Sequence, residues 1–264
     1  MPRRRLDAEL VRRGLAGSRA EAHAAVLAGM VTVAGSLVTK PASLVATDAA
    51  VHVTGDVRNF VSRGGDKLRS GLDRFEVDPG GRDCLDAGAS TGGFTDCLLQ
   101  AGAARVAAVD VGYGQLAWEL RNDPRVTVLE RTNARELIPA DLPFAPDLVV
   151  ADLSFISLRA VLPALVGVSD SGAEFLLLVK PQFEAGSAAV GSGGVVRDPA
   201  VWKRVLGEIV SASQTGGLGV IGVVPSPLVG PAGNVEFLLH GRRGVRDGVL
   251  DLDDAIAEGE ALRR

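Results

Sequence analysis

The sequence has few cysteines, histidines and aromatic residues, and it lacks long apolar runs. Its 264 residues include two cysteines and three scattered histidines, which do not have the spacing of a zinc site. Apolar runs such as Phe175–Val179 are far shorter than the roughly 18 residues of a membrane-spanning helix. Asp7 and Glu9 interrupt the segment where a secretory signal would need apolar residues. The sequence therefore predicts a cytoplasmic protein with free thiols, no metal and no membrane span.

Lysine is also scarce, and positive charge is unevenly distributed. Only four of the 28 basic residues are lysines, and the formal net charge is −4. Residues 1–60 contain eight basic and five acidic residues, a net charge of +3, so the remainder carries −7. A basic amino-terminal segment on an acidic body is typical of a nucleic-acid partner for the smaller part. A solvated basic face is the simpler alternative.

Residues 1–57 are predicted to form a small α+β domain, which is viable at this length. A Ser-x-x-Glu capping box at Ser18–Glu21 is typical of a helix start, and Gly29 is placed to end that helix in a left-handed conformation. The predicted helices span residues 6–13 and 18–28, the predicted strands span 30–33, 37–40 and 50–54, and residues 58–62 follow as an interdomain linker.

The amino-terminal segment resembles the S-four-like RNA-binding module. The resemblance is carried by Arg5-Leu6-Asp7, Leu10, Gly14-Leu15-Ala16, Ser18-Arg19, Ala22, Gly29, Val31-Thr32-Val33 and Gly35. It implies contacts with RNA phosphates, which position an RNA without reading its sequence. The RNA-binding residues that it implies are Arg3, Arg4, Arg5, Arg19 and Lys40.

Residues 63–264 alternate between strand and helix patterns after an opening helix that ends near Phe75. The predicted strands span residues 84–87, 106–110, 126–130, 148–152, 175–180, 218–224 and 235–240, and the predicted helices span 94–99, 115–122, 158–166 and 201–213. This alternation predicts an α/β domain with a doubly wound, Rossmann-like sheet, mostly parallel, with helices on both faces and an antiparallel final strand. Such sheets bind ligands at the carboxyl ends of their strands.

A glycine-rich turn at Asp86–Gly93 links the first strand of this domain to a helix. Asp110 ends the next strand, 22 residues after Gly88, which is the spacing of a carboxylate that accepts ribose hydroxyls. Ser90 stands where a dinucleotide-binding turn has glycine, and this favours S-adenosylmethionine, which has no phosphate. An NAD site and a ligand-free turn are the alternatives. The expected cofactor-binding residues are Asp86, Gly88, Ser90, Thr91, Gly92, Gly93, Asp110, Asn133 and Asp152.

Four residues are predicted to meet at one rim of the sheet. Asp152 and Lys180 end the fourth and fifth strands, and Glu236 lies at the start of the last. An antiparallel last strand brings its start to the carboxyl ends of its neighbours, and Lys67 is within reach on the opening helix. Each residue alone also has a structural interpretation: a helix cap, a snorkelling cation, an edge-strand charge or a solvated helix face.

The carboxyl-terminal 200 or so residues resemble the FtsJ-type ribose 2′-O-methyltransferases, and with the amino-terminal module the chain is similar to the hemolysin A (TlyA) family. The stretches that carry this resemblance are Ser62–Leu68, Asp86–Thr95, Asp110–Gln115, Asp152–Ser157, Lys180–Glu184, Gly193–Asp198 and Gly230–Phe237. It implies S-adenosylmethionine-dependent 2′-O-methylation of cytidine in 23S ribosomal RNA, and in 16S RNA as well for members with a full amino terminus. It implies ribosomal RNA or subunits as partners, with no obligate protein partner, and the catalytic tetrad Lys67, Asp152, Lys180 and Glu236.

The chain departs from the family pattern in one loop. Ser187 follows Gly186, where members often carry a lysine, and Ser192 follows Gly191, which weakens a phosphate-binding role for this loop.

The hypothesis for the chemistry is direct methyl transfer to a ribose oxygen with Lys180 as base. Asp152 would orient the Lys180 amine, and Glu236 would fix Lys67 or the ribose. Three alternatives are cytosine carbon methylation, which needs a nucleophilic cysteine, base-nitrogen methylation, and a non-enzymatic membrane-active hemolysin. The first is disfavoured because Cys84 and Cys97 lie in a predicted strand and a predicted helix, away from the rim. The second is disfavoured because no prolines follow Asp152, and the third because the sequence has no sufficiently long amphipathic basic helix.

Overall fold

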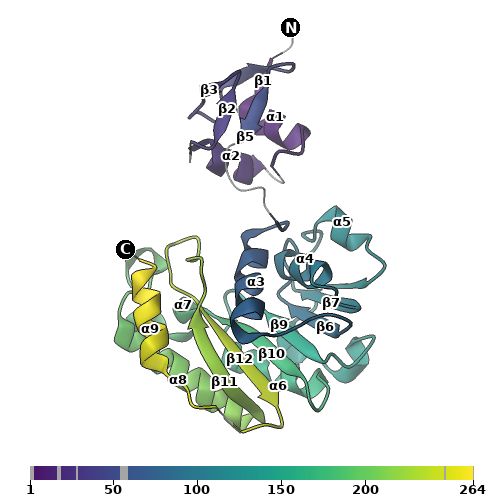
Figure 1. Ribbon diagram of the computed structural model, residues 1–264, viewed down its shortest axis with the longest axis vertical. Helices are drawn as coiled ribbons and strands as arrows, with labels where there is room; N and C mark the ends of the chain where they lie inside the picture. Colours follow the sequence, from purple (N-terminus) through teal and green to yellow (C-terminus); the bar gives the residue numbers. More distant parts are fainter. Residues whose placement is uncertain (1–2, 17–18, 28, 54–58, 247, 264) are drawn as a thin grey trace. The chain divides into compact units, whose positions relative to one another are not determined.

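The computed structural model describes residues 3–16, 19–27, 29–53, 59–246 and 248–263. The chain divides into two compact units, Met1–Asn59 and Phe60–Arg264, which Figure 1 shows with their elements labelled. A separate set of buried apolar residues forms the core of each unit. Among the described residues, the structure contains no helix of the length and apolarity needed to traverse a bilayer.

The amino-terminal unit combines two helices with two small antiparallel sheets. The helices are α1 (Leu6–Arg12) and α2 (Arg19–Leu27), and the strands are β1 (Arg3–Arg5), β2 (Val31–Val33), β3 (Ser36–Leu37), β4 (Leu44–Ala46) and β5 (Val51–Val53). Strand β2 pairs with β3 and β5, which confirms that strands form near the three predicted ranges, although β3 ends at Leu37 and not at Lys40. The sequence patterns missed the pairing of β1 with β4, because three consecutive arginines carry no strand signal. Ser18, the predicted helix cap, lies outside the described residues.

A seven-stranded sheet forms the centre of the larger unit. Its strands are β6 (Asp83–Ala87), β7 (Arg105–Asp110), β8 (Val126–Glu130), β9 (Leu148–Ala151), β10 (Glu174–Val179), β11 (Leu218–Pro225) and β12 (Phe237–Arg243). They follow the order β11-β12-β10-β9-β6-β7-β8. Strand β12 is antiparallel to both neighbours, and the pairings from β10 to β8 are parallel. The start of β12 therefore lies beside the end of β10, as predicted.

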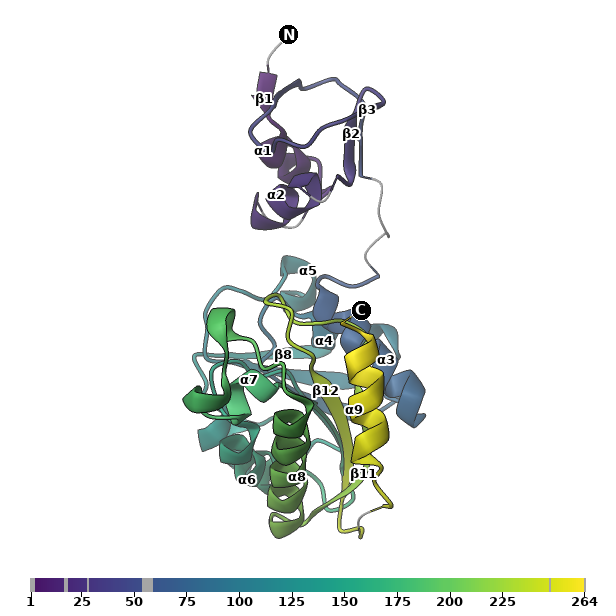
Figure 2. The same ribbon diagram turned by 90° about the vertical axis from the view of Figure 1, so that its left-hand side faces the viewer.

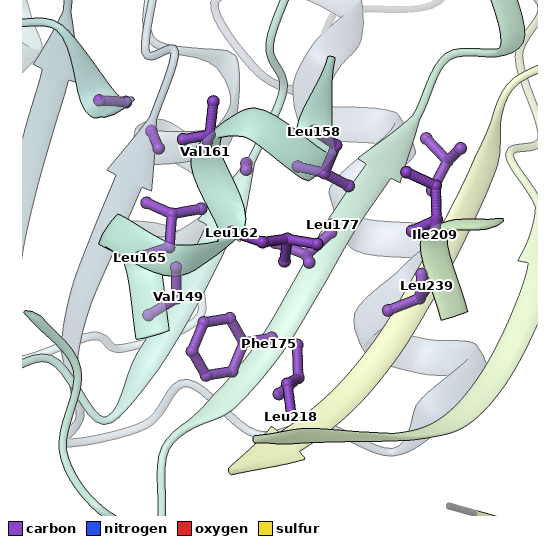
Figure 3. Packing of buried hydrophobic residues seen from close by; sticks show 14 of the residues in the cluster. Val149, Leu158, Val161, Leu162, Leu165, Phe175, Leu177, Ile209, Leu218 and Leu239 are labelled. Atoms are coloured by element: carbon purple, nitrogen blue, oxygen red, sulfur yellow. The ribbon is translucent and has the colours of Figure 1, made fainter. Parts of the chain in front are cut away.

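Helices cover both faces of this sheet. They are α3 (Arg63–Phe75), α4 (Gly93–Gln100), α5 (Trp118–Arg121), α6 (Leu158–Val168), α7 (Pro181–Glu184), α8 (Pro199–Thr215) and α9 (Leu252–Ala261). Side chains of α3, α4 and α5 share one core with one face of the sheet, and those of α6, α8 and α9 share the other. Figure 3 shows the second core, where Leu162 and Leu165 of α6 lie against Val149 and Leu177.

Two helices differ from the sequence prediction. The helix expected over 115–122 is only the single turn α5, because its beginning is taken up by the loop that contains Gly112 and Gly114. Helix α9 was not predicted, since its sequence is largely acidic and alanine-rich. It packs beside α8 and along β11 (Figure 2).

Candidate active site

The turn after β6 has a backbone geometry that requires glycine at Gly88. This residue has a φ of +87°, and a Cβ atom built there would lie 2.5 Å from the carbonyl oxygen of Asp152. The Asp110 carboxylate holds the turn from the neighbouring strand, accepting hydrogen bonds from the Ser90 N–H at 2.8 Å and the Gly112 N–H at 2.6 Å. The turn and the loop after β7 are thus joined through one side chain at the rim of the sheet.

A cavity of about 550 Å³ opens beside this turn. Its walls combine apolar side chains with a few polar groups at the ends of β6, β7 and β9, which is typical of a small-molecule site. The predicted cofactor-binding residues on its wall are Gly88, Ser90, Asp110, Asn133 and Asp152. The cavity has room for a nucleoside, and it contains no cluster of basic side chains that would require a phosphate.

A second cavity of about 300 Å³ adjoins the first and shares Gly88, Ser90, Asp152 and Ser154 with it. The four residues predicted as a catalytic tetrad all line this second cavity: Lys67, Asp152, Lys180 and Glu236. Thr91 and Gly93 line it as well. The topology therefore brings one residue of α3, the residues that directly follow β9 and β10, and the residue that precedes β12 to one place, next to the larger cavity.

The four charged side chains form two ion pairs. Lys67 Nζ lies 2.5 Å from Glu236 Oε2, with side chains only 9% and 2% exposed. Lys180 Nζ lies 2.5 Å from Asp152 Oδ1 and donates a hydrogen bond to Ser154 Oγ at 3.0 Å. Buried charges persist only when they are paired. The pairs thus hold two amines at fixed positions in one small cavity.

Asp86 and Gly92 line neither cavity in the described part of the chain. Asp86 is fully buried beneath the turn, where its Oδ2 accepts a hydrogen bond from Thr95 Oγ1 at 2.7 Å. Burial raises the pKa of Asp86 to about 7. Gly92 has a φ of +101°, and a Cβ there would lie 2.3 Å from Leu120 Cδ1. Both residues therefore contact the protein interior beside the turn and not the wall of a cavity.

Sequence reasoning assigned no role to three further residues at the site. Ser154 accepts from the Lys180 amine. The Phe155 side chain is 91% exposed, with a positive φ of 64°, and its ring lies 5.2 Å from that of Phe183. Arg63 lines the smaller cavity at the start of α3. The position of Ser154 two residues after Asp152 was a signal for its role, whereas the exposure of Phe155 depends on the path of the loop.

The cations predicted to bind RNA are exposed on the amino-terminal unit. Arg3 and Arg4 lie on β1, and Lys40 lies in the loop before β4. Arg5 binds Asp7 through two hydrogen bonds of 3.1 and 2.7 Å, and the Arg19 guanidinium lies 3.4 Å from the same carboxylate. Asp7 therefore holds two of these arginines together.

The two cysteines lie away from both cavities. Cys84 and Cys97 are free and buried, and burial raises the pKa of each thiol to about 12. A thiol in this state is a poor nucleophile, which disfavours cytosine carbon methylation. The described residues contain no group of side chains suited to hold a metal ion.

Comparison with known proteins agrees with this arrangement. Residues 60–243 match the FtsJ-like methyltransferase family, and residues 4–51 match the S4 domain. The 16S/23S rRNA (cytidine-2′-O)-methyltransferase TlyA of Mycobacterium tuberculosis is 56% identical over 238 residues, which cover 90% of this chain and 89% of that protein.

Solved structures show the same relationship. A structure named as a hemolysin from Streptococcus thermophilus is 37% identical, with a TM-score of 0.80 over 99% of this chain and 97% of that one. An S-adenosylmethionine dependent methyltransferase from Listeria monocytogenes, 15% identical, shares the fold with a TM-score of 0.51 over 69% of this chain and 99% of that one. The chain therefore belongs to the FtsJ-like methyltransferases that carry an amino-terminal S4 domain, the family of TlyA.

Proposed function

We propose that the protein transfers a methyl group from S-adenosylmethionine to the 2′-hydroxyl of a cytidine in ribosomal RNA. The observation that carries this proposal is the meeting of Lys67, Asp152, Lys180 and Glu236 in one cavity beside a nucleoside-sized cavity. The activity in the name of the M. tuberculosis relative supports cytidine in 16S and 23S RNA as the substrate.

The larger cavity fits S-adenosylmethionine. Asp110 would accept hydrogen bonds from the ribose hydroxyls, and the Gly88–Gly93 turn would allow close approach of the ligand; the presence of Gly88, Ser90 and Asp110 on the cavity wall supports this. Asn133 and the apolar wall would hold the base, and Asp152 would hold the methionine end where the two cavities join. When bound, the cofactor supplies an electrophilic methyl group on a sulfonium.

Lys180 is proposed as the base that accepts the proton of the ribose hydroxyl, after its ammonium group has first released a proton to solvent. Asp152 and Ser154 fix the direction of its amine, and general-base assistance of this kind contributes about 10²–10⁴ in rate. Lys67 pairs with Glu236. Its positive charge would orient the ribose of the target nucleotide. Holding both reactants in adjoining cavities supplies the orientation that direct transfer needs.

The amino-terminal unit is proposed as the RNA anchor. The S4 match and the exposed cations Arg3, Arg4, Arg5, Arg19 and Lys40 support this role. Phosphate contacts from such a surface would position the RNA, and the chemistry would remain in the larger unit.

Radiolabelled methyl transfer to purified ribosomal subunits tests the proposal. We expect labelled RNA in which one dinucleotide resists alkaline hydrolysis, because a 2′-O-methyl group removes the hydroxyl that attacks the neighbouring phosphate. Label on a base, in RNA that is fully hydrolysed, would instead establish base methylation. Dye leakage from vesicles without any methyl transfer would establish a membrane activity and overturn the proposal.

A further inference from the structure

We propose that Glu184 is a positioning residue for the Asp152–Lys180 pair. Glu184 ends α7, four residues after Lys180, and its carboxylate is almost completely buried. One oxygen, Oε2, accepts a hydrogen bond from Ser157 Oγ at 2.6 Å, and the other, Oε1, accepts from the Leu158 N–H at 2.5 Å. The carboxylate thus bridges the segment that follows β10 to the segment that follows β9. The inference rests on the proposed function, because it concerns the same catalytic pair.

The bridge replaces a missing helix cap. Ser157 is the N-cap residue of α6, yet its side chain accepts no hydrogen bond from a backbone N–H of that helix; it accepts only from the Arg159 side chain, with Nε 3.4 Å from Oγ. The first N–H groups of a helix need acceptors, and its N-terminus favours a negative charge. Glu184 meets both needs from a different element, and Arg159 adds a positive charge with Nε 3.4 Å from the carboxylate. These contacts compensate the cost of burying an ionised side chain.

The two segments that Glu184 joins, residues 152–158 and 180–184, contact each other at three places. At one end Lys180 pairs with Asp152 and donates to Ser154, and in the middle the rings of Phe183 and Phe155 are in contact. At the other end, Glu184 contacts Ser157 and Leu158. Because β9 and β10 are adjacent and parallel, the strands fix only one end of each segment. The Glu184 carboxylate fixes the other, and so restricts the loop that carries Asp152, Ser154 and Phe155.

Two substitutions of Glu184 separate positioning from charge. Glu184→Ala removes both hydrogen bonds. Glu184→Gln can retain both, since its amide oxygen can accept from Leu158 and its amide group can donate to Ser157. We expect Glu184→Ala to lower the single-turnover methylation rate at saturating RNA by about 10- to 100-fold, with cofactor and RNA affinities within about 3-fold. Glu184→Gln should restore most of the rate.

Hydrogen–deuterium exchange of the ligand-free protein provides a readout that does not depend on activity. Faster exchange in Glu184→Ala should be confined to residues 152–158. Glu208→Gln is the matched control, because Glu208 also pairs with Arg159, at 2.7 Å, but within the described residues it forms no ion pair or hydrogen bond with residues 152–158 or 180–184. Its rate and exchange should equal those of the wild type.

The inference is overturned if Glu184→Ala keeps the wild-type rate, if Glu184→Gln is as slow as Glu184→Ala, or if exchange rises throughout the larger unit. If Glu184→Ala does not fold, Ser157→Ala decides, because it removes one bond of the bridge. A several-fold slower rate supports the inference, and an unchanged rate overturns it. Inactivity of the wild-type protein would refute the proposed function itself, which distinguishes the two failures.

Discussion

Two of the four lysines in the chain lie in the smaller cavity, and the choice of lysine over arginine there is informative. Lys180→Arg keeps the positive charge but cannot give up a proton, and its planar group does not match a point-charge site. We expect this variant to fold, to bind S-adenosylmethionine within a few-fold of the wild type, and to lose methyl transfer by on the order of 10²-fold or more. A single-turnover assay with bound RNA measures the loss.

Lys203 provides the control for this substitution, because it is an exposed lysine paired with Asp253 on the surface. Lys203→Arg should leave the rate unchanged. A near-normal rate in Lys180→Arg would show that Lys180 is a replaceable cation and not a base.

Asp86 gives the stability of the protein a defined pH dependence. Burial raises the pKa of Asp86 to about 7, well above the value of about 3.9 of an unfolded chain. Between these values the folded state holds a proton that the unfolded state has lost, so the free energy of unfolding falls as pH rises from about 4 to 7.

The change attributable to Asp86 is at most about 4 kcal/mol. We expect the melting temperature of Asp86→Asn, relative to the wild type, to rise with pH up to about 7 and then to level off. For Asp73→Asn, at an exposed position, the difference in melting temperature from the wild type should stay nearly constant with pH. A constant difference for Asp86→Asn would mean that this carboxyl is ionised throughout.

That Lys67, Asp152, Lys180 and Glu236 meet at one cavity could be predicted from the sequence, whereas the contacts of Glu184 could not. Asp152, Lys180 and Glu236 stand at strand ends, and sheet topology alone brings strand ends together. Glu184 contacts Ser157 and Leu158, which lie 27 and 26 residues earlier in the sequence, and no local pattern marks such a contact. Support of this kind depends on how two loops pack, which periodicity does not encode.

At the scale of elements, the larger sheet was predictable because its strands are short apolar runs separated by helices. Helix α9 was missed because its sequence is rich in acidic residues and alanine, and Ile256 is the one large side chain among its three buried residues, beside Ala255 and Gly259. Strand β1 was missed because backbone pairing with β4, and not side-chain burial, holds its arginines in place.

The glycine turn offers a test of one element's geometry. Gly88→Ala would place a Cβ atom 2.5 Å from the Asp152 carbonyl oxygen and would strain a φ of +87°. We expect it to weaken S-adenosylmethionine binding at least tenfold, about 1.4 kcal/mol, in isothermal titration. Gly81→Ala is the matched control, since Gly81 has a φ of +72° but nothing within 4 Å of a Cβ.

Gly81→Ala shares the backbone strain, which is of order 1–3 kcal/mol, without the clash. Its melting temperature should fall while its cofactor affinity remains that of the wild type. Equal affinities in the two variants would show that the turn does not contact the cofactor.

At the scale of the whole molecule, the charge asymmetry of the sequence matches the division into two units. The unit with a net positive segment has its own core and the exposed cations, and both cavities are lined by the larger, acidic part. The sequence could indicate this division into two units because charge and core-forming residues are both local properties. How Asp7 gathers Arg5 and Arg19 depends on the fold of the smaller unit and was not predictable.

If the amino-terminal unit binds RNA through phosphates, its cations must set the salt dependence of binding. Each lost phosphate contact reduces the slope of log Kd against log salt concentration by about 0.7–0.9. The triple variant Arg3→Gln, Arg4→Gln and Lys40→Gln should therefore reduce the slope by about 2 and weaken RNA binding at low salt. Its methylation rate at saturating RNA should stay near that of the wild type, because none of the three residues lines a cavity.

A second triple variant separates local contacts from overall charge. Arg74→Gln, Arg105→Gln and Lys203→Gln remove the same charge from surface ion pairs of the larger unit. Long-range attraction depends on net charge and is screened within about 10 Å at 0.1 M salt. If binding depended on it alone, both variants would lose the same attraction and would bind RNA with similarly reduced affinity. If the amino-terminal cations contact phosphates directly, the slope of log Kd against log salt concentration should fall in the first variant and stay at the wild-type value in the second. Binding isotherms at four salt concentrations distinguish these outcomes, and equal slopes in the two variants would remove the amino-terminal cations from the RNA interface.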